Sequence, residues 1–248
     1  GNLIAVTVGN GNLDTTCTVT DTLGNTYTQK TATWDTGNSQ KHWQFFAPNI
    51  AGGANTVTAT FGASVSFRRL GIMEISGVTA TPDDGAAAQV QAGSSAADYY
   101  SSGNVTTTAT DFLFGSWQDI GGSGGTITAG ATPAFTLREV NATAVIAMES
   151  RASEASGTFD ANFTNTLGPR AITGMMTFKE TAAAAGGGGD DDEFTDDSVI
   201  PWIQRQRVNR LIGLGMVLAA NPAMARRTLL GGLVVAGLSG SRWFTCRR

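Results

Sequence analysis

The feature that most constrains this chain is a repeated alternation of apolar and polar residues in short segments. In the segment Ala54–Phe61, for example, the apolar Val57, Ala59 and Phe61 alternate with threonines. Successive side chains of a β-strand point to opposite faces, so this pattern indicates a half-buried strand. Turn residues interrupt such segments at intervals of roughly 8 to 12 residues, which is typical of a β-sandwich or barrel.

Composition favours the same fold class for residues 1–180. The chain contains 32 glycines and only 15% charged residues. Up to Glu180 no long segment has an apolar stripe at helical spacing, and the segments between strands lack helices of the βαβ kind. We therefore expect an all-β domain over residues 1–180, built as an antiparallel two-sheet sandwich of the Ig-like or jelly-roll kind.

Two connections are predicted from local residues. The turn Asp21–Asn25 contains Gly24 and Asn25, which tolerate positive φ, so we expect a hairpin between Thr16–Asp21 and Thr26–Gln29. The segment Pro82–Gly103 is rich in Ala, Gly, Ser and Asp and shows little periodicity. We expect it to be a long loop that crosses from one sheet edge to another.

The C-terminal quarter has a different chemistry. Residues 181–197 contain runs of Ala and Gly followed by six acids, and they are expected to form a flexible, solvated linker. Residues 198–248 contain eight arginines and no acid, whereas residues 1–180 contain eight basic and fourteen acidic residues. Ser198 is a suitable N-cap, so a short helical tail is expected to start there. This asymmetry indicates a tail with its own partner.

The tail also carries two apolar runs, Leu211–Ala220 and Leu229–Leu238. Each is about half the length that a membrane-spanning helix needs, so a surface-lying or partner-buried segment is favoured, and membrane contact by the tail stays open. The runs are too apolar for a solvated basic arm, which disfavours nucleic acid as the partner. The residues expected to anchor the tail to a neighbouring subunit are its tryptophans and arginines: Trp202, Arg205, Arg207, Arg210, Arg226, Arg227 and Trp243.

Four segments carry a family resemblance. They are Asp21–Tyr27, Asn49–Thr58, Met73–Val78 and Thr107–Gly115. In this order they resemble the Ig-like or jelly-roll sandwich modules of secreted bacterial proteins and phage structural proteins. The resemblance covers residues 1–180, implies a sandwich fold and supplies no catalytic residue.

Few residues suit catalysis or metal binding. The single histidine, His42, is expected at the solvent or a strand edge, and one histidine with the distant Cys17 and Cys246 makes a poor zinc site. Carboxylate pairs of the glycosidase kind could come from Glu74, Asp111, Glu149 and Asp160, although a strand acid that points to solvent, or that pairs with Arg68 or Arg69, is the commoner explanation. Calcium could bind Asp21 with Asn25, or Asp83 with Asp84, and ordinary turns explain both. We expect no enzyme activity and no cofactor.

Aromatic side chains offer a route to sugar binding. Trp34, Trp43 and Trp117 are more commonly core residues, so Tyr99 and Tyr100 are the expected exposed pair for a surface glycan. The leading interpretation is a non-enzymatic structural or adhesive module, extracellular, on a cell surface or on a virion. Its tail docks into neighbouring subunits of an oligomeric assembly. The alternatives are a secreted carbohydrate-binding module and, after it, a glycoside hydrolase.

Overall fold

The computed structural model describes residues 1–11, 15–93, 98–122, 124–131, 134–141 and 145–182. In these ranges the chain consists of sixteen strands and the connections between them, and all of the strand pairs are antiparallel. The prediction of an all-β, antiparallel domain is confirmed. The predicted helical tail, and the predicted linker after Ala182, lie outside the described residues.

One central sheet is built from the first third of the chain, together with a small sheet beside it. The strands of this first central sheet lie in the order β3 (Thr28–Asp35), β4 (Gln40–Pro48), β1 (Asn2–Asn10) and β6 (Arg69–Ser76). The small sheet pairs β2 (Cys17–Asp21) with β5 (Val57–Phe61).

The second central sheet is built from the remaining long strands. Its order is β12 (Thr136–Asn141), β13 (Ile146–Glu154), β10 (Asp111–Asp119), β16 (Ala171–Glu180) and β7 (Val78–Gln91). Two further small sheets accompany it, one of β11 (Ile127–Ala129), β15 (Asn162–Asn165) and β8 (Asp98–Ser101), the other of β14 (Thr158–Phe159) and β9 (Val105–Thr106).

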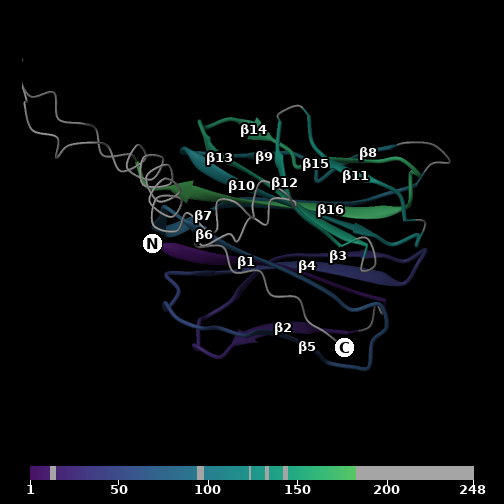
Figure 1. The fold of residues 1–248 in the computed structure, drawn as a ribbon, viewed down its shortest axis with the longest axis horizontal. Helices are drawn as coiled ribbons and strands as arrows, with labels where there is room; N and C mark the ends of the chain where they lie inside the picture. Colours follow the sequence, from purple (N-terminus) through teal and green to yellow (C-terminus); the bar gives the residue numbers. More distant parts are fainter. Residues whose placement is uncertain (12–14, 94–97, 123, 132–133, 142–144, 183–248) are drawn as a thin grey trace, which may run out of the picture. The chain divides into compact units, whose positions relative to one another are not determined.

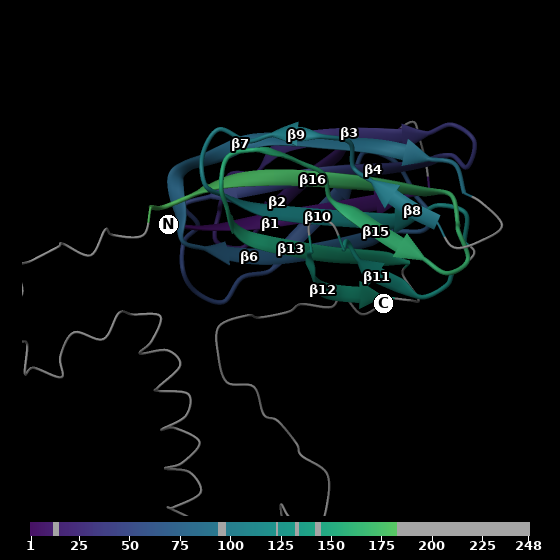
Figure 2. The same cartoon turned by 90° about the horizontal axis from the view of Figure 1, so that it is seen from above.

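The sheets are stacked in layers (Figures 1 and 2). The two central sheets face each other across a core that contains Leu3, Phe46, Phe114 and Phe178. The β2–β5 sheet covers the outer face of the first central sheet, and the small sheets β11–β15–β8 and β14–β9 cover the outer face of the second. The described strands therefore form five sheets, and the finer assignment to a two-sheet Ig-like or jelly-roll sandwich stays a prediction.

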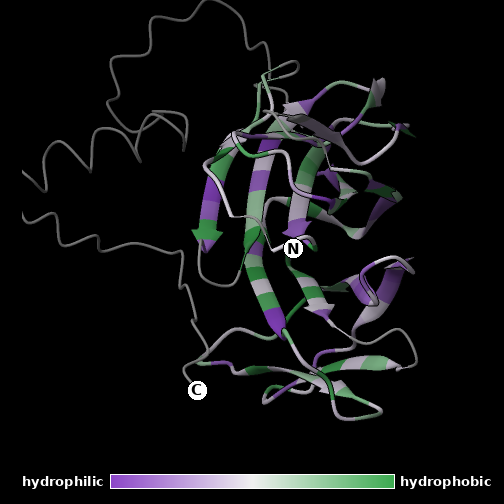
Figure 3. Cartoon of the chain, turned by 90° about the vertical axis from the view of Figure 1, so that its right-hand side faces the viewer, coloured by the Kyte–Doolittle hydropathy of each residue, from purple (hydrophilic) through white to green (hydrophobic). Residues whose placement is uncertain are grey.

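Layering explains why both faces of β1 are apolar. Leu3 and Ala5 pack between the two central sheets, whereas Ile4, Val6 and Val8 pack beneath the β2–β5 sheet. A strand that lies between two covering layers must bury both of its faces. Strands with only one covered face instead alternate apolar and polar residues. Figure 3 shows this pattern as alternating hydrophobic and hydrophilic bands along many strands.

The hairpin predicted around Asp21–Asn25 is wrong. Residues 22–23 do form a turn, but β2 pairs with β5 and not with the segment that follows the turn. The chain instead crosses into the first central sheet, where β3 pairs with β4. Turn residues specify a change of direction, whereas the pairing partner is set by long-range packing.

The long loop predicted for Pro82–Gly103 is also wrong for most of its length. Residues 78–91 form β7, and β8 follows at Asp98–Ser101. The sequence pattern did not indicate this strand because its side chains are small and are packed on both faces. Ala86 packs into the core between the central sheets, and Ala87 packs into the cluster beneath the outer small sheets. Pro82 is tolerated because β7 is an edge strand.

Candidate functional site

A groove lies where the two central sheets meet along one side. It is lined on one wall by the β6 residues Ile72–Ser76. The other wall contains Phe112 of β10, Arg138 of β12, Ser150 and Ala152 of β13, and Glu180 of β16. Its volume is about 330 Å³. A hollow of this size suits a small ligand or an extended peptide segment.

The groove has an apolar floor and charged edges. Met73 and Ile75 are buried in the central core, and Phe112 packs against the same core. Glu74 is exposed and accepts a hydrogen bond from Asn2 Nδ2 at 2.9 Å. Arg138 donates from Nε to Ser150 Oγ at 2.6 Å, which ties β12 to β13. With Glu180, the lining thus holds two carboxylates and one guanidinium.

His42 is not at the surface, and that expectation is wrong. It lies fully buried on β4, which is an interior strand of the first central sheet. Its Nε2 lies 2.6 Å from Thr7 Oγ1 and 3.3 Å from Ser116 Oγ. Burial, followed by the positive charge of Arg69, lowers the pKa of His42 to about 3. The imidazole is therefore neutral at physiological pH.

The Ser116–His42 contact does not have the arrangement of a catalytic triad. In a triad a carboxylate accepts a hydrogen bond from the second ring nitrogen of the histidine and orients it. Among the described residues, His42 Nδ1 has no hydrogen-bond partner. Ser116 is itself fully buried between the sheets. The contact therefore acts within the interior and joins the two central sheets.

Glu149 is held by the backbone of the outer layer. It is fully buried, and its two carboxyl oxygens accept hydrogen bonds from Gly130 N at 2.9 Å and Asn162 N at 3.0 Å. Burial is the main cause that raises the pKa of Glu149 to about 8, and the charge of Asp160 adds to it. Both oxygens are engaged in joining β13 to the covering layer.

The other predicted carboxylates are dispersed. Asp111 is buried on β10, where burial and then the charge of Asp84 raise its pKa to about 7. Glu74 lies in the groove, and Asp160 accepts a hydrogen bond from Tyr99. The structure thus brings Glu149 close enough to Asp160 for their charges to interact, and it places Glu74 elsewhere.

Asp21 is a turn residue whose oxygens are already occupied. It accepts hydrogen bonds from the backbone of Leu23 and Asn25 and from the side chains of Asn25, Tyr27 and Asn55. Partial burial acts to raise the pKa of Asp21, but these hydrogen bonds outweigh it and lower the pKa to about 2. The donors leave few lone pairs for a calcium ion.

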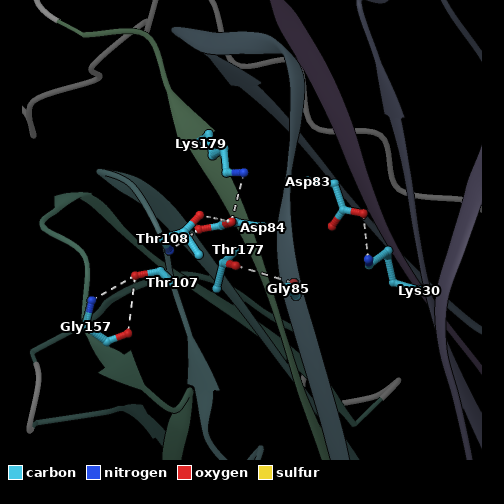
Figure 4. Close-up of polar contacts among 9 residues, drawn as sticks. All are labelled: Lys30, Asp83, Asp84, Gly85, Thr107, Thr108, Gly157, Thr177 and Lys179. Carbon is cyan, nitrogen blue, oxygen red and sulfur yellow. Dashed lines mark hydrogen bonds and ion pairs between the residues drawn. The ribbon is translucent and has the colours of Figure 1, made fainter.

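Asp83 and Asp84 likewise face protein donors (Figure 4). Asp83 forms an ion pair with Lys30 at 2.7 Å. Asp84 accepts from Thr108 N at 2.5 Å and Thr108 Oγ1 at 2.6 Å, and it lies 3.0 Å from Lys179 Nζ. The two aspartates point to different partners and do not share one cation position (Figure 4). Within the described ranges, no group of three or more His, Cys, Asp or Glu residues is arranged to hold a metal.

The expectation of an exposed tyrosine pair is wrong for Tyr100. Tyr100 is fully buried, where its hydroxyl donates to Pro169 O at 2.5 Å and its ring lies edge-on to Trp117. Tyr99 alone is exposed, at 49%. The two residues alternate on β8, so one face of the strand points outward and the other inward. A glycan-binding surface made of both rings is therefore excluded.

The predicted anchor residues lie outside the described residues. They are Trp202, Arg205, Arg207, Arg210, Arg226, Arg227 and Trp243. In the part of the chain that is described, no helix has the length and apolar character needed to cross a membrane.

Sequence reasoning missed most of the groove, although Glu74 was singled out. Ile72–Ser76 and Arg138 come from strands more than sixty residues apart, and no local pattern indicates that these strands adjoin. Comparisons of the chain with protein-family models, with curated proteins and with solved structures found no match.

Proposed function

We propose that the chain is a non-enzymatic structural or adhesive module of a virion surface or a bacterial envelope. In this proposal the β domain of residues 1–180 projects outward. The tail of residues 198–248 docks into a neighbouring subunit or surface, and residues 181–197 connect the two. The module is then extracellular, on a cell surface or on a virion.

The observation that carries the proposal is that the β domain fills its own interior. Both faces of each central sheet are covered by apolar clusters drawn from residues between Leu3 and Phe178. The apolar runs Leu211–Ala220 and Leu229–Leu238 come after these cores are complete. Their burial would be gained against a partner, and burial of apolar area drives association.

The environment of the titratable groups is consistent with a structural role. His42 and Glu149 have strongly shifted pKa values, which can mark a catalytic site. Both side chains are fully buried, and each has a hydrogen-bond partner in another layer: Ser116 for His42 and Gly130 for Glu149. Structural networks shift pKa values in the same way, so these groups support layer packing.

Removal of residues 198–248 tests the proposal. The full chain is expected to sediment as an assembly, or to associate with particles or envelopes. The truncated chain is expected to remain monomeric and unattached. A matched control replaces the exposed β-domain residues Trp34 and Tyr99 with alanine and leaves the tail intact. Association that survives the truncation unchanged contradicts the proposal.

A carbohydrate-binding module is the second candidate, and the groove is what favours it. Glu74, Glu180 and Arg138 surround an apolar floor, and such groups can hydrogen-bond sugar hydroxyls while a ring packs below them. Glycan-array binding that is lost with Arg138→Ala and kept with Tyr99→Ala would favour this function. Hydrolysis that disappears with Glu74→Gln would instead favour a glycosidase.

A further inference from the structure

The strand that walls the groove is paired on one side only within the described chain. β6 pairs with β1 along its whole length, from Asn2↔Ser76 to Gly9↔Arg69, and it is the last strand of its sheet. Its other edge therefore presents backbone N–H and C=O groups toward the groove. Such an edge is a template for an added strand.

The chemistry of the groove specifies what kind of segment would fit. An added strand would meet the apolar Ile72 and Phe112 together with the carboxylates of Glu74 and Glu180. Arg138 is partly engaged, because its Nε donates to Ser150 Oγ. The matching segment is apolar, carries basic residues and has no acid.

The chain leaves the β domain at this groove. Glu180, the last residue of β16, lines it. Thr181 then donates from its backbone N to Gly77 O at 2.8 Å, directly after the end of β6. All of residues 183–248 follow from this point, so the groove lies where the chain leaves the β domain.

We propose that the groove is the receptor for the tail segment Arg226–Leu238, which adds as a strand to the free edge of β6. This inference rests on the proposed function and names the place where the tail docks. Arg226 and Arg227 face the carboxylates of Glu74 and Glu180, and the run Leu229–Leu238 covers the apolar floor. In the assembly a neighbouring copy supplies the segment.

Length and composition agree with this assignment. The ten residues Leu229–Leu238 would span about 33 Å as a strand, and the eight residues of β6 span about 26 Å. The run contains no proline and no charged residue, so it can pair along its length. The stretch between Glu180 and Arg226 is long enough to reach a neighbour, and exchange of an identical element between copies costs little.

A disulfide cross-link in the full chain tests the contact. Ser76, which is exposed at the end of β6, is replaced by cysteine together with Leu229→Cys, in a background of Cys246→Ser. Leu229 lies opposite Ser76 if the added strand is antiparallel to β6 and places Arg226 and Arg227 at the end of β6 that carries Glu74 and Glu180. Cys17 is buried and stays reduced. A disulfide between copies is expected under mild oxidation, at a yield about tenfold above that of a control with Thr58→Cys in place of Ser76→Cys. Equal yields in the two proteins overturn the proposal.

Charge exchange provides a second, independent readout. Glu74→Lys with Glu180→Lys should lower the cross-link yield about tenfold, and Arg226→Glu with Arg227→Glu in the same chain should restore it. Glu139→Lys, on the neighbouring edge strand and outside the groove lining, is the matched control and should leave the yield unchanged. Loss of the cross-link without rescue contradicts the assignment.

The outcomes of these experiments distinguish a failure of the proposed docking site from a failure of the proposed function. If deletion of residues 198–248 abolishes assembly while the cross-link and charge variants behave like their controls, the tail docks elsewhere and only this inference fails. If the cross-link forms while the deletion leaves assembly unchanged, the groove assignment stands and the proposed function fails.

Discussion

Thr7 Oγ1 and His42 Nε2 lie 2.6 Å apart on the inner face of the first central sheet. Ser116 Oγ of the second central sheet lies 3.3 Å from the same nitrogen. The three side chains are fully buried, and they place a polar contact beside the aromatic core between the sheets. A buried polar group must be hydrogen-bonded to avoid a large desolvation cost, so the histidine fixes how the sheets face each other.

His42, the single histidine of the chain, should titrate far below the usual range of an imidazole. Its imidazole should stay neutral from pH 8 down to about pH 4, because burial and the Arg69 charge lower its pKa to about 3. The ring resonances in an NMR titration are thus expected to stay constant over this range. A midpoint between pH 6 and 7 would show that the ring is exposed.

The same shift predicts a pH dependence of stability. The folded-state pKa lies below the unfolded value, so His42 contributes stability above about pH 6.5 that is lost as the pH falls toward 3. His42→Gln should remove this acid-side loss and should lower the free energy of unfolding near neutral pH by about 1–3 kcal/mol. Chemical denaturation at several pH values measures both effects. An unchanged acid limb in the variant would contradict the assignment.

The contribution of Glu149 to stability should depend on pH in the opposite direction. Because burial raises its folded-state pKa to about 8, its contribution to stability is complete below about pH 4.5 and is lost as the pH rises through 8. Glu149→Gln should flatten the alkaline side of the stability profile. At pH 5, where the Glu149 carboxyl is protonated, it should cost about 1–2 kcal/mol, because the hydroxyl oxygen of the acid still accepts a backbone hydrogen bond and the amide NH2 of glutamine does not. An alkaline limb as steep as in the wild type would contradict this account.

Asp21 should be a structural residue without a calcium ion. Asp21→Ala removes a carboxylate that accepts five hydrogen bonds and should lower the free energy of unfolding by about 2–3 kcal/mol. Wild-type stability should also fall as the pH drops from about 4 to 2, because the folded-state pKa lies near 2. Thermal unfolding with and without excess calcium is the check, and a calcium-dependent rise in Tm would favour a metal site.

The neighbouring tyrosines form a matched pair of variants. Tyr100→Phe removes the buried hydroxyl that donates to Pro169 O and should cost about 1–2 kcal/mol. Tyr99→Phe removes an exposed hydroxyl that lies 3.3 Å from Asp160 Oδ2 and should cost less than about 0.5 kcal/mol. Comparison of their denaturation midpoints tests the burial of Tyr100. Equal effects would contradict it.

Sequence reasoning recovered the fold class because period-two alternation is a local property. The two faces of Val57–Phe61 follow directly from it. It failed at β7, where a run of small residues packs on both sides without an apolar pattern. Gly85 illustrates the reason, since a Cβ atom there would lie 2.5 Å from Val105 Cγ1. Such a requirement belongs to the packed structure and cannot be seen in one segment.

The site was harder to predict than the fold. Burial of His42 depends on Thr7 and Ser116, which come from different strands and different sheets. The groove depends on β6 and β12 meeting at one side of the molecule. Pairing of distant strands is decided by the total packing of the layers. The sequence around a residue such as Arg138 therefore does not indicate that the residue lines the groove.

We expect residues 1–182 to complete their own hydrophobic interior without the arginine-rich segment. Thermal unfolding of a chain that ends at residue 182, compared with the full chain under the same conditions, tests it most directly. The truncated chain should unfold in a cooperative transition with a Tm within about 4 °C of the full chain, which corresponds to a stability change below about 1 kcal/mol. A truncated chain that unfolds without a cooperative transition would contradict the claim, because the missing segment would then be part of the same core.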